Sequence, residues 1–310
     1  MAEADAARPG GDLRKYLRPE VLVKLRRLDL IARLVVEGFV TGLHRSPFHG
    51  FSVEFAEYRE YSPGDEIKHV DWKVFGRTDR YYVKVYEEET NLQAFIVLDK
   101  SASMEFRSHL APASKLTYGS WVAASLAYML LGQRDSVGLV TYDNAVRDFL
   151  PASQHPGHLK VLIKQLDAME PGADSSMGEV LHGLAERVRR KGLFIIISDL
   201  LDDPEAIVHA LRHLRYRRHE VILFHTLDPA ELTFPYRDML KLVDLEGGQE
   251  EIVDPAAIRA SYLEEMRGFI DRIRMGCRTN RADYVQLDTS RPLGMALTRY
   301  LATRSEVKLR

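Results

Sequence analysis

The sequence of 310 residues has a single cysteine, Cys277, and no long apolar run. One cysteine excludes an intramolecular disulfide framework. The most apolar early stretch, LDLIARLVVEGFV, is too short to span a bilayer and contains Arg33. The first residues, MAEADAARPGGDLRKY, lack the apolar region of a signal peptide, and we interpret residues 1–16 as a flexible tail. These absences predict a reducing, cytoplasmic setting without membrane insertion.

An excess of charge of either sign is also missing, since the formal net charge is −2. We therefore expect no global field that attracts nucleic acid, and no nucleic-acid partner. Two basic segments, RHLRYRRHE at 212–220 and KVFGRTDRYYVK at 73–84, keep a nucleic-acid-binding module as an alternative function. The first segment has a simpler explanation, because Arg and His at the end of a helix complement the helix dipole.

Short apolar strands and helical patterns alternate from residue 92 onward. The clearest strands are LQAFIVLD, LFIIIS, EVILFHTL and DYVQLD, and a hairpin is expected around Asn144, with a second hairpin over 241–254. Wholly apolar strands between helices predict a doubly wound, mainly parallel α/β sheet of the Rossmann type, covered on both faces. We expect helices over 19–40, 112–132, 156–168, 177–191, 204–217, 256–275 and 292–303.

The chain is expected to have three parts. Residues 1–16 form the tail, and residues 17–90 form an N-terminal helix with a small β-rich module. The large α/β domain spans residues 91–304. The middle part differs in composition from the rest, because residues 41–90 are rich in glycine, aromatic and charged residues.

Polar side chains directly follow two of the predicted strands. LQAFIVLD ends on Asp99, and Ser101 and Ser103 come next, as Asp-x-Ser-x-Ser; LFIIIS is followed by Asp199. Because the carboxyl ends of parallel strands meet at one edge of an open sheet, we expect these side chains to lie together there. Asp and Ser are also common turn residues, so a plain polar turn is the alternative for each motif.

A third loop, EPGADSSMGEV, lies before a predicted helix. Ser176 and Glu179 fit a Ser-x-x-Glu capping box, which leaves the hydroxyl of Ser175 outside the helix and free to act. The two serines are interchangeable in this interpretation, so Ser176 stays an alternative to Ser175. Asp203 precedes Pro204 and fits a helix N-cap.

The candidate set contains only hard oxygen donors: Asp99, Ser101, Ser103, Ser175 and Asp199. Such donors suit Mg²⁺ or Mn²⁺ and argue against zinc. Hydroxyls can bind the cation directly while carboxylates act through water. The cation then stays positive and keeps an open position, which an Asp or Glu of a partner protein would complete.

This arrangement resembles the metal-ion-dependent adhesion site of von Willebrand factor A domains. The segment over 42–89 is similar to the signature of the bacterial family called domain of unknown function fifty-eight, and the resemblance covers about residues 40–300. Its hallmarks here are Glu54, Phe55, Arg59, Tyr61, Pro63, Gly64, Asp65, Asp71, Trp72, Glu88 and Glu89.

The resemblance implies a von Willebrand factor A-like fold, a bound Mg²⁺ or Mn²⁺, and a partner. The implied partner is an AAA ATPase of the MoxR type, and such pairs are thought to act as chaperones that assemble or activate client proteins. The chain would then be an adaptor or co-chaperone. Longer members of the family carry membrane helices, whereas this sequence has none.

Two residues depart from the usual adhesion-site pattern. Ser175 stands where A domains usually have Thr, and it lacks the methyl group that fixes the rotamer of a threonine hydroxyl. Lys100 lies within the predicted metal loop, where a cation weakens metal binding unless its side chain points away from Asp99.

A Mg²⁺-dependent hydrolase acting on phosphate or acyl substrates is a further alternative. The sequence has no Walker-type phosphate loop, and no base lies near Ser101 to activate it as a nucleophile. We therefore expect no enzymatic activity. Asp65, Asp71 and Trp72 form a second candidate group without assigned chemistry; Asp65 bonding its own turn and Trp72 anchoring the module on the A domain are the structural explanations.

Overall fold

The chain is divided into two units that we describe separately. Contacts group residues 1–46 with 92–310, and residues 47–91 form a smaller unit. The computed structural model describes residues 18–25, 27–43, 58–60, 72–78, 80–84, 93–243, 250–294 and 297–298.

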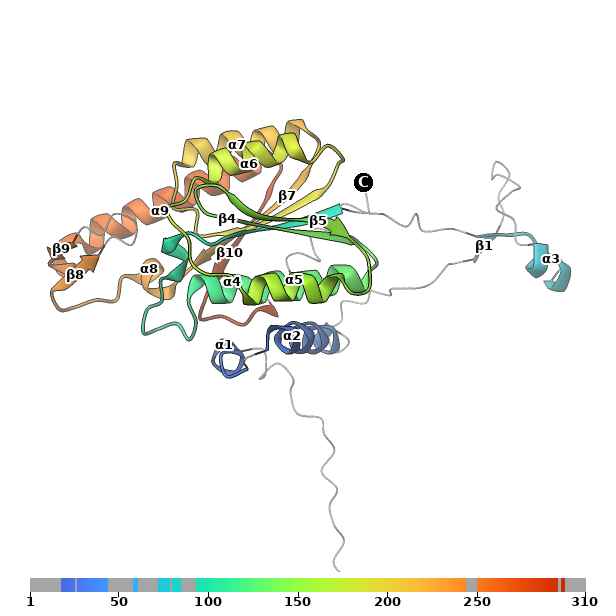
Figure 1. Cartoon of the computed structure of the whole chain (residues 1–310), viewed down its shortest axis with the longest axis horizontal. Coiled ribbons are helices and arrows are strands. Elements are labelled where there is room, and N and C mark those ends of the chain that lie inside the picture. Colours follow the sequence, from blue (N-terminus) through green and yellow to red (C-terminus); the bar gives the residue numbers. More distant parts are fainter. Residues whose placement is uncertain are drawn as a thin grey trace, which may run out of the picture. The chain divides into compact units, whose positions relative to one another are not determined.

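A six-stranded sheet in the order β10-β7-β6-β3-β4-β5 forms the centre of the larger unit (Figure 1). Neighbouring strands are parallel except β5, which is antiparallel to β4 and forms the expected hairpin around Asn144. The strands are β3 (Gln93–Asp99), β4 (Ser136–Tyr142), β5 (Val146–Ser153), β6 (Leu193–Ser198), β7 (Glu220–Leu227) and β10 (Asp283–Asp288).

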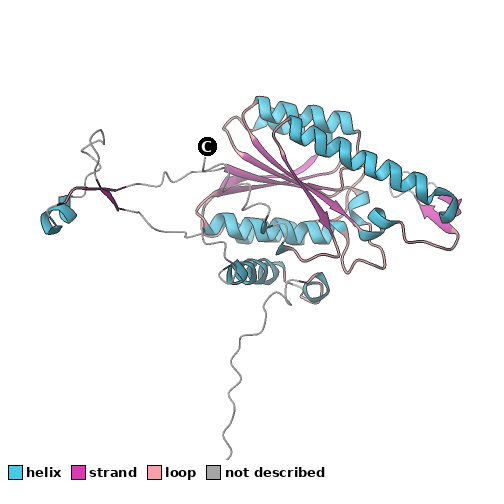
Figure 2. Cartoon of the chain, turned by 180° about the vertical axis from the view of Figure 1, so that it is seen from behind, coloured by secondary structure: helices cyan, strands magenta, loops and turns pink. Residues whose placement is uncertain are grey.

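Helices cover both faces of this sheet (Figures 1 and 2). One face carries α4 (Lys115–Gly132) and α5 (His158–Asp167), and α2 (Leu28–Leu43) packs against α4. The other face carries α6 (Met177–Arg187), α7 (Pro204–Tyr216) and α9 (Pro255–Thr279). The predicted doubly wound, mainly parallel α/β fold is therefore confirmed.

The central strand β3 shows why its sequence is apolar throughout. Ile96 and Leu98 belong to the core beneath α4, whereas Phe95 and Val97 belong to the core beneath α6 and α7. Since successive side chains of a strand point to opposite faces, a strand with helices on both sides needs apolar residues at every position. The apolar run ends at Asp99, which is itself buried and begins the candidate site.

Shorter elements complete the larger unit. They are α1 (Pro19–Leu22), the 3₁₀ turn η3 (Ala102–Glu105), α8 (Pro229–Thr233), and the antiparallel pair β8 (Leu240–Val243) and β9 (Glu250–Val253). The pair confirms the hairpin expected over 241–254. No helix in the described parts of the chain is long and apolar enough to cross a membrane.

Two helix predictions differ from the structure. The helix expected over 19–40 is split, since α1 ends at Leu22 and α2 begins at Leu28. Leu22 and Leu28 both reach the same core, which the break allows. The helix expected over 177–191 ends at Arg187, and most of the one expected over 292–303 lies outside the described residues.

The N-terminal helices share their core with the sheet domain. Ile31 and Val35 of α2 are buried in the same cluster as Trp121 of α4. The contact-based boundary therefore falls after residue 46, whereas the sequence suggested one part from 17 to 90.

The described part of the smaller unit consists of a strand pair and a helix. β1 (Tyr58–Glu60) pairs antiparallel with β2 (Tyr82–Lys84), and α3 spans Trp72–Thr78. The ring of Trp72 contacts the rings of Phe75 and Tyr81, and 57% of Trp72 is exposed. Its anchoring of the module on the sheet domain stays a prediction. Asp65, Asp71 and most of the other signature residues lie outside the described residues.

Candidate metal centre

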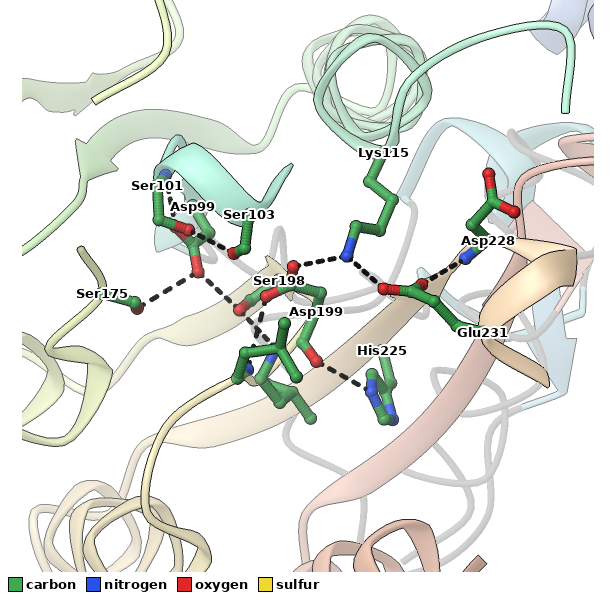
Figure 3. Close-up of polar contacts among 12 residues, drawn as sticks. Asp99, Ser101, Ser103, Lys115, Ser175, Ser198, Asp199, His225, Asp228 and Glu231 are labelled. Carbon is green, nitrogen blue, oxygen red and sulfur yellow. Dashed lines mark hydrogen bonds and ion pairs between the residues drawn. The ribbon is translucent and has the colours of Figure 1, made fainter. Parts of the chain in front are cut away.

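Asp99 lies at the carboxyl end of β3 and is fully buried. Its Oδ1 accepts the backbone N–H of Ser101 at 2.8 Å. Its Oδ2 accepts the hydroxyl of Ser198 at 2.6 Å and that of Ser175 at 3.4 Å (Figure 3). Two loops and the end of β6 therefore meet at one carboxylate.

The two serines of the Asp-x-Ser-x-Ser motif lie side by side. Their hydroxyl oxygens are 3.1 Å apart, and both residues are buried. Ser101 precedes η3 but makes no side-chain capping bond. The hydroxyl of Ser101 is thus not used by the helix. The hydroxyl oxygens of Ser101 and Ser103 point toward the carboxylate of Asp99 (Figure 3).

The loop before α6 is fastened to the metal loop by backbone hydrogen bonds. The N–H of Gly172 donates to the carbonyl of Lys100 at 2.6 Å, and the N–H of Ala102 donates to the carbonyl of Ala173 at 3.0 Å. Of the two alternative serines, Ser175 is the one whose hydroxyl contacts Asp99.

The capping box predicted for α6 is wrong. Ser176 is the N-cap residue but makes no side-chain capping bond. Instead, Asp202 reaches across from the loop after β6 and accepts the N–H of Gly178 at 3.2 Å. The cap predicted at Asp203 is confirmed, because its carboxylate accepts two N–H groups of the first turn of α7.

Asp199 follows β6 as predicted, but its carboxylate already has a cationic partner. The Nζ of Lys115 lies 2.7 Å from its Oδ2, and a second carboxylate, Glu231, lies 2.7 Å from the same Nζ. The side chains of Lys115 and Asp199 are 1% and 0% exposed. The charges of the two acids outweigh the effect of burial and raise the pKa of Lys115, so it is a permanent ammonium ion.

Sequence reasoning missed Lys115 and Glu231, although each has a sequence signal. Lys115 stands in the first turn of α4, after the N-cap Ser114, where the helix dipole disfavours a cation. Such a lysine needs a nearby acid. Glu231 completes a capping box with Asp228, which the spacing Asp-Pro-Ala-Glu suggests.

His225 lies on β7 behind Asp199 and is held in its neutral form. Its Nε2 is 2.9 Å from the backbone carbonyl of Asp199, which can only accept, so Nε2 donates. Its Nδ1 then accepts the hydroxyl of Tyr284 at 2.7 Å. Burial lowers the pKa of His225 to about 4. Both ring nitrogens are therefore committed to structural hydrogen bonds.

The charge balance of the site differs between its two aspartates. Asp199 is paired with an ammonium ion, whereas the hydrogen-bond partners of Asp99 are neutral hydroxyl and N–H groups. Burial, and then the charge of Asp199, raise the pKa of Asp99 to about 6. Beside it, the buried hydroxyl of Tyr142 has no hydrogen-bond partner within the described part of the chain.

These residues fit a hard divalent cation in part. A buried carboxylate without a counter-ion, with hydroxyls around it, is a donor set for Mg²⁺ or Mn²⁺. Asp99, Ser101, Ser103 and Ser175 are the residues that would hold the ion, and Asp199 is diverted to Lys115. Among the described residues, no group of three His, Cys, Asp or Glu side chains could hold a metal, so any ion here depends on hydroxyls.

Several known proteins are similar to this chain in sequence. An uncharacterized protein of Mycobacterium tuberculosis, Rv1480, is 27% identical over 294 residues, which is 92% of this chain and 90% of that protein. The uncharacterized YeaD of Bacillus subtilis is 25% identical over 132 residues, which is 41% of this chain and 30% of that protein.

Solved structures to which this chain is similar include BatB of Bacteroides thetaiotaomicron and the VWA domain of SpRpn10. BatB is 17% identical, with 69% of this chain and 99% of that chain covered and a TM-score of 0.48. The SpRpn10 domain is 12% identical, with 67% and 93% covered and a TM-score of 0.39. We assign the α/β fold from the strand order and from the helices on both faces of the sheet, and not from these TM-scores.

A protein-family model matches the part of the chain that contains several of the signature residues noted in the sequence. Residues 57–268 match the family described as Protein of unknown function DUF58, and this segment is more than half of the chain. The protein belongs to the DUF58 family.

Proposed function

We propose that the chain is a metal-dependent protein-interaction module, an adaptor or co-chaperone of a MoxR-type AAA ATPase. One observation carries the metal dependence. Asp99 is a buried carboxylate with only neutral partners, and two hydroxyls lie beside it at the edge of the sheet. Burying an unpaired charge is strongly unfavourable, and a bound cation removes that penalty.

The four residues Asp99, Ser101, Ser103 and Ser175 would hold Mg²⁺ or Mn²⁺. When bound, the ion supplies a positive charge that can accept a carboxylate from another protein. Hydroxyl ligands are neutral, so they leave most of that charge uncompensated. A partner Asp or Glu therefore gains more at this edge than at an ion surrounded by protein acids.

The identity of the partner rests on the family resemblance. The resemblance indicates a MoxR-type ATPase and its client proteins as partners. With such a partner, the cytoplasm is the location that we propose. Two basic residues of the segment considered for nucleic-acid binding have partners within this chain. Arg217 pairs with Glu186, and Arg215 donates to the carbonyl of His219. These contacts favour a structural role for that segment.

The same geometry gives less support to a hydrolase. A serine nucleophile needs an adjacent base, and in the described part of the chain the Ser101 hydroxyl is hydrogen-bonded to another hydroxyl, that of Ser103. His225, the histidine behind the site, has both ring nitrogens engaged. A binding role for the site therefore needs fewer assumptions.

The test is the affinity of the purified chain for a MoxR-type ATPase of the same organism, with Mg²⁺ and with EDTA. We expect binding with Mg²⁺ that falls at least about tenfold with EDTA, because a carboxylate–metal contact is lost. Asp99→Ala should weaken binding to the level seen with EDTA. Asp271→Ala is the control, since Asp271 is an exposed acid on α9.

Two results would contradict the proposal. Affinity that is the same with Mg²⁺ and EDTA removes the metal-bridged contact. Loss of binding in Asp271→Ala but not in Asp99→Ala moves the contact surface to α9.

A further inference from the structure

The ammonium group of Lys115 is enclosed at the edge of the sheet. It is within 2.7 Å of both Asp199 and Glu231, and Figure 3 shows it between these carboxylates, on the side of Asp199 away from Asp99. Its side chain is 1% exposed. A buried ammonium ion is strongly desolvated, so it is retained only where acids compensate it.

The position of Lys115 is fixed from two sides. The backbone N–H of Lys115 donates to the carbonyl of Phe106, which ties the start of α4 to the end of the metal loop. On the other side, Glu231 also accepts the backbone N–H of Asp228 at 2.7 Å, and Asp228 accepts the N–H of Ser108. The backbone of Lys115 and its partner Glu231 are therefore both held in place by hydrogen bonds.

Both oxygens of Asp199 are engaged in this arrangement. Oδ2 accepts the ammonium of Lys115, and Oδ1 accepts the N–H of Leu201 at 3.3 Å. Asp99, in contrast, has an oxygen whose contacts are two serine hydroxyls. Hydroxyl groups can rotate to a different partner, whereas breaking a buried ion pair leaves an uncompensated charge.

We infer that Lys115 is an affinity-setting residue that holds Asp199 away from the cation, so that the site binds Mg²⁺ through one carboxylate, Asp99. The inference rests on the proposed metal site and adds its mechanism of tuning. Affinity for hard cations rises with the number of charged ligands. By occupying Asp199, Lys115 keeps the ion weakly held and electrophilic, which favours a carboxylate brought by a partner.

Calorimetric titration with Mg²⁺ alone tests this inference. Lys115→Met keeps most of the length of the unbranched side chain and removes its charge, which releases Asp199. We expect this variant to bind Mg²⁺ at least about tenfold more tightly than wild type. Asp199→Asn in the wild-type background should change the affinity by less than about threefold, while Asp99→Ala should abolish binding.

A second variant guards against misfolding. Lys115→Met leaves two acids without a counter-ion, whereas Lys115→Met with Glu231→Gln leaves only Asp199. This double variant should fold more readily and show the same gain in Mg²⁺ affinity. Adding Asp199→Asn to Lys115→Met should return the affinity to that of wild type, because the gain acts through Asp199.

The outcomes separate this inference from the proposed function. If wild type binds Mg²⁺ and the folded Lys115 variants bind no more tightly, the tuning role is wrong and the metal site stands. If only the Lys115 variants bind, the tuning role stands and the wild-type metal dependence is wrong. If neither binds, both are wrong.

Discussion

At the scale of single residues, the buried groups of the candidate site differ in how they hold protons. His225 is neutral because burial lowers its pKa to about 4, despite the opposing charge of Asp199. Lys115 and Arg274 add to the lowering, and the hydroxyl of Tyr284 bonds the ring from the remaining side. A neutral ring is the form that its two hydrogen bonds require.

Acid should therefore destabilise the protein through His225. In the unfolded chain this residue takes up a proton near its ordinary pKa of 6.5, whereas in the folded protein it does so only near 4. Between these values the unfolded state binds more protons, so stability is complete above pH 6.5 and falls as the pH drops toward 4. The loss amounts to at most about 3 kcal/mol.

The measurement compares urea unfolding of wild type and His225→Gln across this pH range. Asp99, with its pKa raised to about 6, acts in the opposite direction, so only the difference between the two proteins isolates His225. We expect the variant to be less stable at neutral pH by about 1–2 kcal/mol, because hydrogen bonds are lost, and to lose less stability on acidification. Equal loss in both proteins would contradict the protonation argument.

At the scale of elements, α7 and α9 approach each other closely through Gly276. A Cβ atom at this position would lie 2.2 Å from Cγ2 of Val208 on α7. Gly276→Ala is therefore expected to destabilise the fold by about 1–3 kcal/mol, since overpacking forces neighbours to move. Thermal unfolding of the variant measures this effect.

A second substitution at the same contact should reverse the effect of Gly276→Ala. In Val208→Ala the atom at 2.2 Å is removed and the remaining Cβ lies 3.4 Å away, an ordinary contact. The double variant should recover most of the stability lost in Gly276→Ala. A double variant as unstable as the sum of the two single variants would show that the helices do not meet here.

The sequence predicts an element well where the residues of that element determine its structure. It predicts poorly where the structure depends on a contact between segments distant in the sequence. Apolar strands such as β3 and β6 were predicted correctly because burial on both faces requires apolar residues at every position. The cap of α6 was missed because the acceptor, Asp202, belongs to a loop distant in the sequence. The ion pair of Lys115 and Asp199 joins positions 84 residues apart, and no local pattern reveals their distance.

At the scale of the whole molecule, the core beneath α4 is closed by segments from both ends of the chain. Leu28 and Ile31 of α2 are buried in it, as are Leu293 and Leu297 beyond β10. The alternation of apolar strands and helices in the sequence predicted a sheet with a layer of helices on each face. The additional layer made by α2 could not be predicted from the sequence, because an amphipathic pattern shows that one face of a helix is buried but not which surface that face contacts.

Removal of residues 1–43 tests whether α1 and α2 are part of the sheet domain. The larger buried side chains of α2 are Leu28, Ile31, Val35 and Val36. At about 1.5–3 kcal/mol each, their burial contributes at most roughly 6–12 kcal/mol. A whole domain is stable by only about 5–15 kcal/mol. The truncated chain should therefore lose its cooperative thermal transition and bind an apolar dye.

Removal of residues 1–16, the tail predicted from the sequence, is the matched control and should leave the transition unchanged. A cooperative transition within a few degrees of the full chain after removal of 1–43 would show that α2 covers the sheet domain without stabilising it.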